Sequence, residues 1–489
     1  MSYDCRAASP VSVDDDITKE ATVRTRRPVA CLIVLAMAAA ACSPAVSVPS
    51  NSAPSATTAW PAPTVPLATT APSATTAPAT SPPSATTPPS TALASPTQSA
   101  PTPSATPSPS AGVSPSPSTA TVFRRWVRSD LPDPGPSVFG GGTVPVGVVA
   151  FHGAYFAAGW VVTSCCDGGD AWRNRGVIWT SADGRSWTLH DPIRGLKHAT
   201  LIDLVTDGTR LVATGLFVAP VPNNPGEFVP AVWASSDGIT WLRASGTIPS
   251  LVAAGAHGFI GAVVGSYPST DMPFFQFVTS TDGLTWTKAS EVFDGDLDGL
   301  AARPDGTAMA VGHVPGTPSA DGGLSADVVV WRSADGTAWT GPEVVVNNAV
   351  PDAVTSDAGD FVALVHKQMR SPGGTYNDTS EIWRPTQVDA RRPGAIALSV
   401  EESLDSIFVI GDTLIATGDT LEHGASNAMA WISTDGGATW RRLADPQAFR
   451  DINNELAGIV PTPAGLLAVG NYWERATSHR VPSVWLAGR

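Results

Sequence analysis

From residue 122 to the C-terminus, short apolar runs alternate with clusters of turn residues. Residues 211–215, with the sequence LVATG, are typical: small and β-branched side chains follow a tight turn that contains glycine. A variable stretch comes next, then a second run that holds tryptophan, a Ser-x-Asp-Gly turn and a further short run with another tryptophan. Short β-branched runs bounded by Gly, Asp and Ser predict β-strands. This part of the chain is therefore expected to be all-β.

The four-run unit repeats along the chain, and two separate markers give the same count. Tight-turn glycines recur at spacings of 48 to 55 residues, at Gly153, Gly208, Gly258, Gly306, Gly359, Gly411 and Gly465. The third run carries a second series, at Trp179, Trp233, Thr279, Trp331, Trp383, Trp431 and Trp485. Seven units of four strands predict a seven-bladed β-propeller.

The turn between the third and fourth runs has a fixed pattern of serine, aspartate and tryptophan. It occurs five times, at Ser181, Asp183 and Trp187; Ser235, Asp237 and Trp241; Ser280, Asp282 and Trp286; Ser333, Asp335 and Trp339; and Ser433, Asp435 and Trp440. The last copy has the full form Ser-x-Asp-x-Gly-x-Thr-Trp, which resembles the BNR/Asp-box repeat of sialidase-like β-propellers. Unit five lacks it. Ser and Asp side chains bond the backbone of tight turns, and five copies around a ring cannot converge on one substrate. We expect these residues to be structural.

The two ends of the repeat region predict how the ring closes. The last unit ends shortly after Trp485 without a fourth run, while residues 122–128 resemble fourth runs such as residues 439–442. We expect this N-terminal strand to complete the last blade, which removes an exposed sheet edge. Residues 122–489 then form one domain.

The longer connections should all emerge at one end of the ring, where rigid scaffolds commonly place function. We expect them at residues 160–175, 216–230, 266–276, 313–328, 367–381, 419–428 and 471–482. The candidate binding residues on them are Trp160, Trp172, Arg173, Arg175, His313, Lys367, Arg370, Tyr376, Tyr472, Trp473, Glu474 and Arg475. Aromatic and polar side chains together suit a sugar or a peptide. The alternative is that the rings pack only within their own loops.

These observations favour binding or scaffolding of an extracytoplasmic glycan or protein over catalysis. The sialidase resemblance would imply six blades, a Phe-Arg-Ile-Pro motif and a Tyr–Glu pair, whereas this chain counts seven units and lacks the motif. The second hypothesis is a glycan-active hydrolase, which needs two facing carboxylates. Asp170, Asp378, Glu422 and Glu474 are available, but no spacing selects a pair.

Residues 43–121 differ sharply from the repeats. They contain 19 of the 45 prolines, a single glycine and no charged side chain, and are otherwise mostly Ala, Ser and Thr. A segment with so little to bury is expected to be disordered. We interpret it as a spacer, whose Ser and Thr content permits O-glycosylation.

The N-terminus has the features of an export signal. Arg24, Arg26 and Arg27 precede a short apolar run, and Ala39-Ala40-Ala41-Cys42 resembles a bacterial lipobox. The resemblance implies a signal segment over residues 1–42, lipidation of Cys42 and attachment to the outer face of the cytoplasmic membrane; the alternative is a soluble secreted protein. Translation could begin at Met1 or at Val23. The adjacent Cys165 and Cys166 then form no disulfide framework, and their own state stays open.

Charge narrows the range of partners. The net charge is −14 and lies in the repeat region, which argues against nucleic acid and anionic lipid as ligands. Asp294, Asp296 and Asp298 resemble the start of a calcium loop, but the repeat places a strand after them, so a plain acidic connection is the favoured interpretation. We expect no obligatory cofactor and a monomer.

Overall fold

The computed structural model describes a ring of strands within the C-terminal three-quarters of the chain. The described residues are 126–135, 142–164, 173–221, 224–316, 326–356, 359–370, 376–384, 396, 398, 402–422, 425–443, 449, 454–474, 476 and 479–488. The signal segment, Cys42, the spacer and the pair Cys165-Cys166 lie outside them. Within the described part, no helix is long and apolar enough to cross a bilayer.

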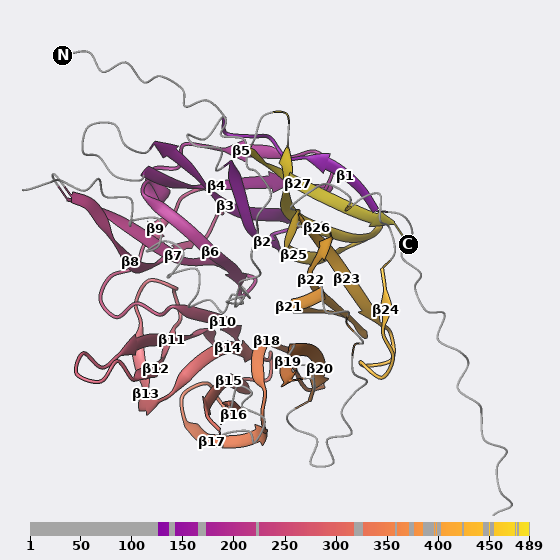
Figure 1. Ribbon diagram of the computed structural model, residues 1–489. Helices are drawn as coiled ribbons and strands as arrows, with labels where there is room; N and C mark the ends of the chain where they lie inside the picture. The colour runs from indigo at the N-terminus through magenta and orange to yellow at the C-terminus, as the bar shows by residue number, and fades with distance from the viewer. Residues whose placement is uncertain are drawn as a thin grey trace, which may run out of the picture. The chain divides into compact units, whose positions relative to one another are not determined.

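Seven antiparallel sheets, here called blades one to seven, surround a centre (Figure 1). Blade one contains β2 (Thr143–Phe151), β3 (Ala154–Ser164), β4 (Arg173–Ser181) and β5 (Thr188–His190); blade two contains β6 (Ala199–Thr206), β7 (Leu211–Val221), β8 (Asn224–Ser235) and β9 (Leu242–Arg243). Blade three contains β10 (Leu251–Gly255), β11 (Gly258–Ser266), β12 (Pro273–Ser280) and β13 (Thr287–Asp294); blade four contains β14 (Asp296–Ala302), β15 (Ala308–Pro315), β16 (Ala326–Ser333) and β17 (Trp339–Val346). The predicted all-β, seven-bladed propeller is confirmed.

The remaining blades complete the ring. Blade five contains β18 (Val350–Ser356), β19 (Phe361–Arg370) and β20 (Tyr376–Trp383); blade six contains β21 (Glu402–Ile410), β22 (Thr413–Glu422), β23 (Ala425–Ser433) and β24 (Arg441–Arg442). Blade seven contains β25 (Glu455–Thr462), β26 (Gly465–Glu474), β27 (His479–Gly488) and β1 (Trp126–Asp130). The short 3-10 helix η3 (Arg194–Leu196) connects blades one and two. Blade five has three strands among the described residues instead of the expected four, and it is the unit that lacks the Ser-x-Asp turn.

The N-terminal strand closes the ring as predicted. β1 pairs antiparallel with β27, with Trp126 opposite Ala487 and Asp130 opposite Ser483. Trp126 is buried and packs edge-on against Phe449, with 5.8 Å between the ring centroids. The Arg128 guanidinium lies 4.0 Å from the centroid of the Tyr472 ring. The two ends of the domain therefore hold each other in one sheet.

Tryptophans of the third strands form the core between blades. Trp179, Trp233, Trp331 and Trp485 are completely buried, each in a cluster shared with the preceding blade. The strand register corrects one member of the predicted series. Val278 pairs with Gly261 two positions before Ser280, so Val278 and not Thr279 occupies the place of the tryptophan in blade three. Counting back from the serine would have avoided this error.

The recurring glycine of the LVATG run has a packing reason. In five blades, a Cβ at this glycine would lie within 2.6 Å of a first-strand carbonyl oxygen; the glycines are Gly159, Gly215, Gly312, Gly418 and Gly470. At the same level the first strand contains a β-bulge, where one extra residue bends the strand. Glycine allows the bulged strand to lie against the second strand.

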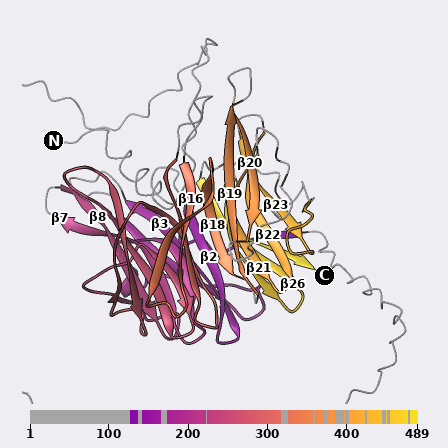
Figure 2. The same cartoon turned by 90° about the horizontal axis from the view of Figure 1, so that it is seen from below.

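The ring has two distinct ends. We call the end with the first-to-second and third-to-fourth strand turns the turn end, and the opposite end the loop end. In Figure 2 the strands run between these two ends, and the hairpin β19–β20 extends beyond its neighbours at the loop end. Much of what the sequence predicted as loop is strand: β7 continues to Val221 and β8 begins at Asn224. Strand pairing simply continues beyond the repeat consensus, because the backbone hydrogen bonds need no particular side chain.

Candidate functional site

Six first strands contain a bulge near the loop end, and the residue that it leaves unpaired differs between blades. These residues are Val146, Ile202, Asp298, Asp352, Asp405 and Ala457, in blades one, two, four, five, six and seven. Aspartate therefore occupies the bulge in three successive blades. Bulges redirect side chains and are frequent beside functional sites. The loop end of blades four to six is accordingly the candidate site.

In blade four the bulge brings Asp298 to a histidine on the next strand. The His313 Nδ1 atom lies 2.7 Å from Asp298 Oδ2, and His313 Nε2 lies 3.5 Å from Asp296 Oδ2. Asp298 is nearly buried, whereas the His313 side chain is 30% exposed. The hydrogen bond with Asp298 raises the pKa of His313, and the charge of Asp296 adds to the effect. His313 is thus held between two carboxylates as an oriented donor that still reaches solvent.

Blade five repeats this arrangement. His366 Nδ1 lies 2.7 Å from Oδ1 of Asp352, the bulge residue of β18. Both side chains are nearly buried. The two blades also influence each other, since burial raises the pKa of Asp298 while His313 and, more weakly, His366 act to lower it. His366 thus has a small effect on the pKa of Asp298 in the neighbouring blade.

Blade six continues the polar row with a different chemistry. Asp419 accepts hydrogen bonds from the hydroxyls of Ser403 and Ser426. In the strand register, Asp419 of β22 occupies the position that His313 and His366 occupy in β15 and β19. We call the six residues Asp296, Asp298, His313, Asp352, His366 and Asp419 the polar arc.

The polar arc covers only part of the ring. The corresponding second-strand positions in blades one, two and three are Trp160, Leu216 and Val264, which are apolar. In blade seven the position belongs to Asn471, whose amide is buried and has no hydrogen-bond partner within the described residues. At this second-strand position, blades four to six therefore carry polar side chains and blades one to three carry apolar ones.

Several predicted binding residues have structural contacts instead of open positions. Arg175 forms a two-point hydrogen bond with Asp191, at 2.7 Å for both nitrogens, and so ties β4 to the connection that leads to blade two. Lys367 pairs with Glu381 across β19 and β20 at 3.2 Å. Tyr472 is buried beneath Arg128. All three residues lie in strands, where neighbouring strands and connections supply partners for their side chains.

The other predicted residues fall into two groups. Trp160, Trp473 and Glu474 are half-buried at the loop-end ends of β3 and β26, and Glu474 has contacts of its own. Arg173, Arg370 and Tyr376 lie at the loop-end ends of strands β4, β19 and β20. Trp172 and Arg475 lie outside the described residues. Of the carboxylates considered for hydrolysis, Asp170 also lies outside the described residues, while Asp378 lies in β20 and Glu422 at the end of β22.

The three aspartates considered for calcium are divided between different partners. Asp294 accepts a hydrogen bond from the Tyr267 hydroxyl at 2.9 Å, while Asp296 and Asp298 contact His313. Within the part of the chain that the structure describes, no three His, Cys, Asp or Glu side chains are grouped to hold a metal ion. Asp296 and Asp298 thus orient His313 from within strand β14, and the predicted plain acidic connection is wrong for these two residues because the strand begins at Asp296.

The Ser-x-Asp turns lie at the turn end, away from the polar arc, and are internally bonded. In blade two, Ser235 Oγ accepts from the Gly238 N–H at 2.8 Å, and Asp237 Oδ1 accepts from the N–H groups of Ile239 and Thr240. Trp241 donates to the Gly238 carbonyl at 3.0 Å. Burial opposes ionisation of Asp237, but these backbone donors outweigh it and lower its pKa to about 2. These bonds give each turn a structural role.

The sequence pointed to His313 and, as weak calcium candidates, to Asp296 and Asp298, but not to their pairing or to Asp352. The bulge residues follow apolar or proline residues and precede small ones, as Leu-Asp-Gly, Pro-Asp-Ala and Leu-Asp-Ser at residues 297–299, 351–353 and 404–406. Alignment of the first strands of the units would have placed these three aspartates in one column. That column was the available signal.

No protein-family model matches this chain, and no curated protein matches it either. Solved structures are similar to this chain at low identity. The GH74 xyloglucanase from Xanthomonas campestris is 14% identical over 71% of this chain and 52% of its own, with a TM-score of 0.43. The Trypanosoma rangeli sialidase is 14% identical over 63% of this chain and 54% of its own, with a TM-score of 0.35. The GH93 α-L-arabinofuranosidase of Fusarium graminearum is 11% identical over 74% of this chain and 97% of its own, with a TM-score of 0.39. This chain thus spans about half of the first two proteins.

Proposed function

We propose that the propeller is a binding module for a neutral, hydroxyl-rich glycan, and that the polar arc at its loop end holds the ligand. The observation that carries the proposal is the repeated His–Asp pair in blades four and five. Two imidazoles with their Nδ1 atoms bound to carboxylates present their Nε2 sides in fixed directions. Side chains that are already ordered lose little entropy when a ligand binds.

The chemistry of the arc matches that of sugar hydroxyls. Carboxylates accept hydrogen bonds, an imidazole nitrogen donates or accepts one according to its protonation, and a hydroxyl does both. The apolar second-strand positions of blades one to three, with the half-buried Trp160 in β3, offer a surface for the C–H faces of a sugar ring. Small-molecule sites commonly combine an apolar wall with a few fixed polar groups.

The charge balance selects among glycans. The arc contains four carboxylates against two histidines, within a protein of net charge −14. Acidic sugars would meet like charge, which disfavours them by repulsion. We therefore expect neutral or amino-bearing sugars to bind and acidic ones, sialic acid included, to bind poorly.

Glycan hydrolysis is the second candidate, because Asp298 is a nearly buried carboxyl with a raised pKa that lies beside further carboxylates. Such a group can act as a general acid when a second carboxylate lies roughly 5–10 Å away across the substrate. Its hydrogen bond to His313 argues instead for a positioning role. Incubation of the purified protein with each bound oligosaccharide, followed by a reducing-end assay, distinguishes turnover from binding alone.

The proposal extends to location. A lipid on Cys42 and the spacer 43–121 would hold the ring outside the cytoplasmic membrane, where envelope glycans are available. The support for this is the lipobox-like sequence before Cys42. Membrane fractionation of the native protein and of Cys42→Ala tests it: the variant should leave the membrane fraction, and an unchanged distribution would refute the anchor.

A glycan array with the purified protein is the first experiment. The wild-type protein should bind a set of neutral oligosaccharides saturably, and the double variant His313→Gln/His366→Gln should bind them at least tenfold more weakly. His152→Ala, at an exposed turn of blade one on the turn end, is the matched control and should bind normally. Thermal unfolding curves that show all three proteins folded at the assay temperature establish that the comparison concerns the site.

A further inference from the structure

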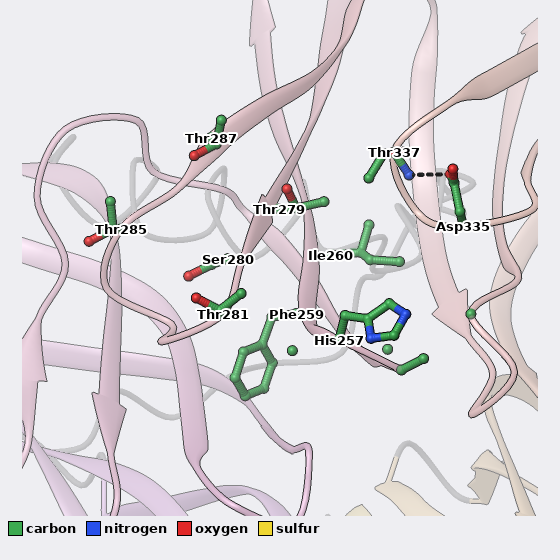
Figure 3. A pocket seen from close by; sticks show the side chains of 14 residues that line it. His257, Phe259, Ile260, Thr279, Ser280, Thr281, Thr285, Thr287, Asp335 and Thr337 are labelled. Atoms are coloured by element: carbon green, nitrogen blue, oxygen red, sulfur yellow. Dashed lines mark hydrogen bonds between the residues drawn. The ribbon is translucent and has the colours of Figure 1, made fainter.

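A pocket of about 340 Å³ lies at the turn end between blades three and four (Figure 3). The polar arc lies at the opposite end of the strands, the loop end. One wall is the turn between β10 and β11, with His257. A second wall is the face of blade three that is turned towards blade four, and the third is the Ser-x-Asp turn of blade four, with Asp335 and Thr337. The volume lies within the range of about 300–1,000 Å³ that is common for small-molecule sites.

At the turn end of the first strand, blade three has small residues where blades one and six have large ones. Gly255 ends the first strand opposite Gly258, and Ala256 follows it in the turn. At the corresponding end of the first strand, blade one has Phe151 and blade six has Ile410. The missing side chains leave space above the buried Phe259 and Ile260.

Hydroxyl side chains are the most frequent polar groups in an otherwise largely apolar lining. Thr279 and Thr287 face each other across β12 and β13, so both side chains lie on the same face of the blade. Thr281 and Thr285 come from the following turn, and Thr337 comes from blade four (Figure 3). Each threonine offers a hydroxyl that both donates and accepts, beside a methyl group that packs against carbon.

One wall of the pocket carries a fixed negative charge. Asp335 accepts hydrogen bonds from the N–H groups of Ala338 and Thr337, and these lower its pKa to about 2. The carboxylate is ionised at neutral pH and disfavours an anionic ligand. A metal ion would need further ligands, and the described residues contain no such cluster. A neutral ligand that offers both hydrogen-bond donors and acceptors fits best.

We propose that this pocket binds one ring of a neutral saccharide. Ring hydroxyls would donate to Asp335, while Thr279, Thr287 and His257 supply the remaining hydrogen bonds, and the C–H face of the ring would pack on Ile260 and the threonine methyls. The proposal is independent of the glycan site at the loop end. Two sites at opposite ends would let one molecule bridge two glycan chains.

The test is saturation-transfer NMR and calorimetry on the purified full chain, with glucose, galactose, mannose and N-acetylglucosamine as probes. At least one sugar should bind saturably in the millimolar range. Ala256→Trp should abolish binding because its indole would fill the pocket, and position 256 is exposed, so the fold should tolerate it. Thr279→Val should weaken binding at least fivefold without a change in volume.

Two controls separate this site from the rest of the ring. Thr188→Val, on the outer strand of blade one, should leave binding unchanged. The double variant His313→Gln/His366→Gln should also bind the monosaccharide normally, even though it loses the loop-end glycan. The proposal is overturned if none of the four sugars saturates the protein, if binding survives Ala256→Trp, or if the monosaccharide is lost only with the loop-end variant.

Discussion

His313 Nδ1 and Asp298 Oδ2 lie 2.7 Å apart, across two strands of blade four. The same distance and the same ring atom join His366 to Asp352 one blade further on. The pairs recur because both aspartates sit in the bulge of a first strand and both histidines occupy the matching position of the second. The repeated blade structure thus places the same His–Asp hydrogen bond in two neighbouring blades.

Asp298→Asn should lower the pKa of His313, because the carboxylate that stabilises the imidazolium is removed. Histidine-selective NMR titration measures it. Because the pKa of His313 is higher in the folded protein, its ion pair with Asp298 stabilises the fold fully at pH values below the pKa of histidine in the unfolded chain, about 6.5. This stabilisation is lost as the pH rises through the pKa of His313 in the folded protein. Asp294→Asn, which removes a carboxylate bonded to Tyr267, is the control. An unchanged His313 titration in Asp298→Asn would contradict the pairing.

Trp126→Ala should destabilise the whole ring, because Trp126 is buried where β1 closes blade seven. Loss of a buried tryptophan typically costs about 3–5 kcal/mol. Deletion of residues 122–130 should lower the melting temperature further. Val127→Ala changes an exposed neighbour on the same strand and should have little effect. If scanning calorimetry finds the deletion as stable as the wild type, β1 is dispensable and the closure has no energetic role.

Gly238→Ala and Gly208→Ala should differ although both glycines have a positive φ, of 77° and 86°. Either substitution costs on the order of 1–2 kcal/mol in the left-handed region. At Gly238 the new Cβ would also lie 2.0 Å from the buried Phe156 ring, whereas nothing lies within 4 Å at Gly208. Overpacking should add about 1–3 kcal/mol to the first variant. Urea unfolding compares them, and equal midpoints would mean that blades one and two are not packed through this turn.

Acid should weaken the fold through the Ser-x-Asp turns. The pKa of Asp237 is lowered to about 2 and that of Asp282 is also lowered, in both cases by backbone N–H donors that outweigh burial. A depressed carboxyl stabilises the fold above its unfolded pKa and loses this effect as the pH falls through the folded value. Stability should therefore decline from about pH 4 towards pH 2. Asp237→Asn should show a shallower decline in denaturation curves across that range; an identical slope would place the acid sensitivity elsewhere.

Much of the architecture could be predicted from the sequence, because the same local sequence features recur in nearly every blade. The tight-turn glycines, the tryptophans of the third strands and the Ser-x-Asp turns each mark a fixed place in the blade, so seven units and the closure by β1 followed directly. The loop boundaries were predicted less well. Pairing between β7 and β8 extends through Val221 and Asn224 on backbone hydrogen bonds, which leave no signal in side-chain periodicity.

The candidate site was only partly predictable, for a different reason. The sequence predicts His313 as a loop residue, but its orientation depends on the hydrogen bond with Asp298. The two side chains meet because the bulge in β14 turns Asp298 towards β15. Asp419 is not predicted because blade six has an aspartate at the register position where blades four and five have a histidine. Arg175 and Lys367 were chosen for their charge, and their actual partners, Asp191 and Glu381, depend on register. Contacts across strands require the register, which residue spacing alone does not provide.

The most direct test of the account is a calorimetric titration of a neutral oligosaccharide, chosen from the array, into the wild-type protein and into His313→Gln/His366→Gln. The account predicts saturable binding by the wild type and affinity at least tenfold weaker in the double variant, a difference of about 1.4 kcal/mol or more. His152→Ala should match the wild type. Equal affinity in all three proteins, or no binding of any neutral glycan by the wild type, would contradict the claim that the polar arc is a glycan-binding site.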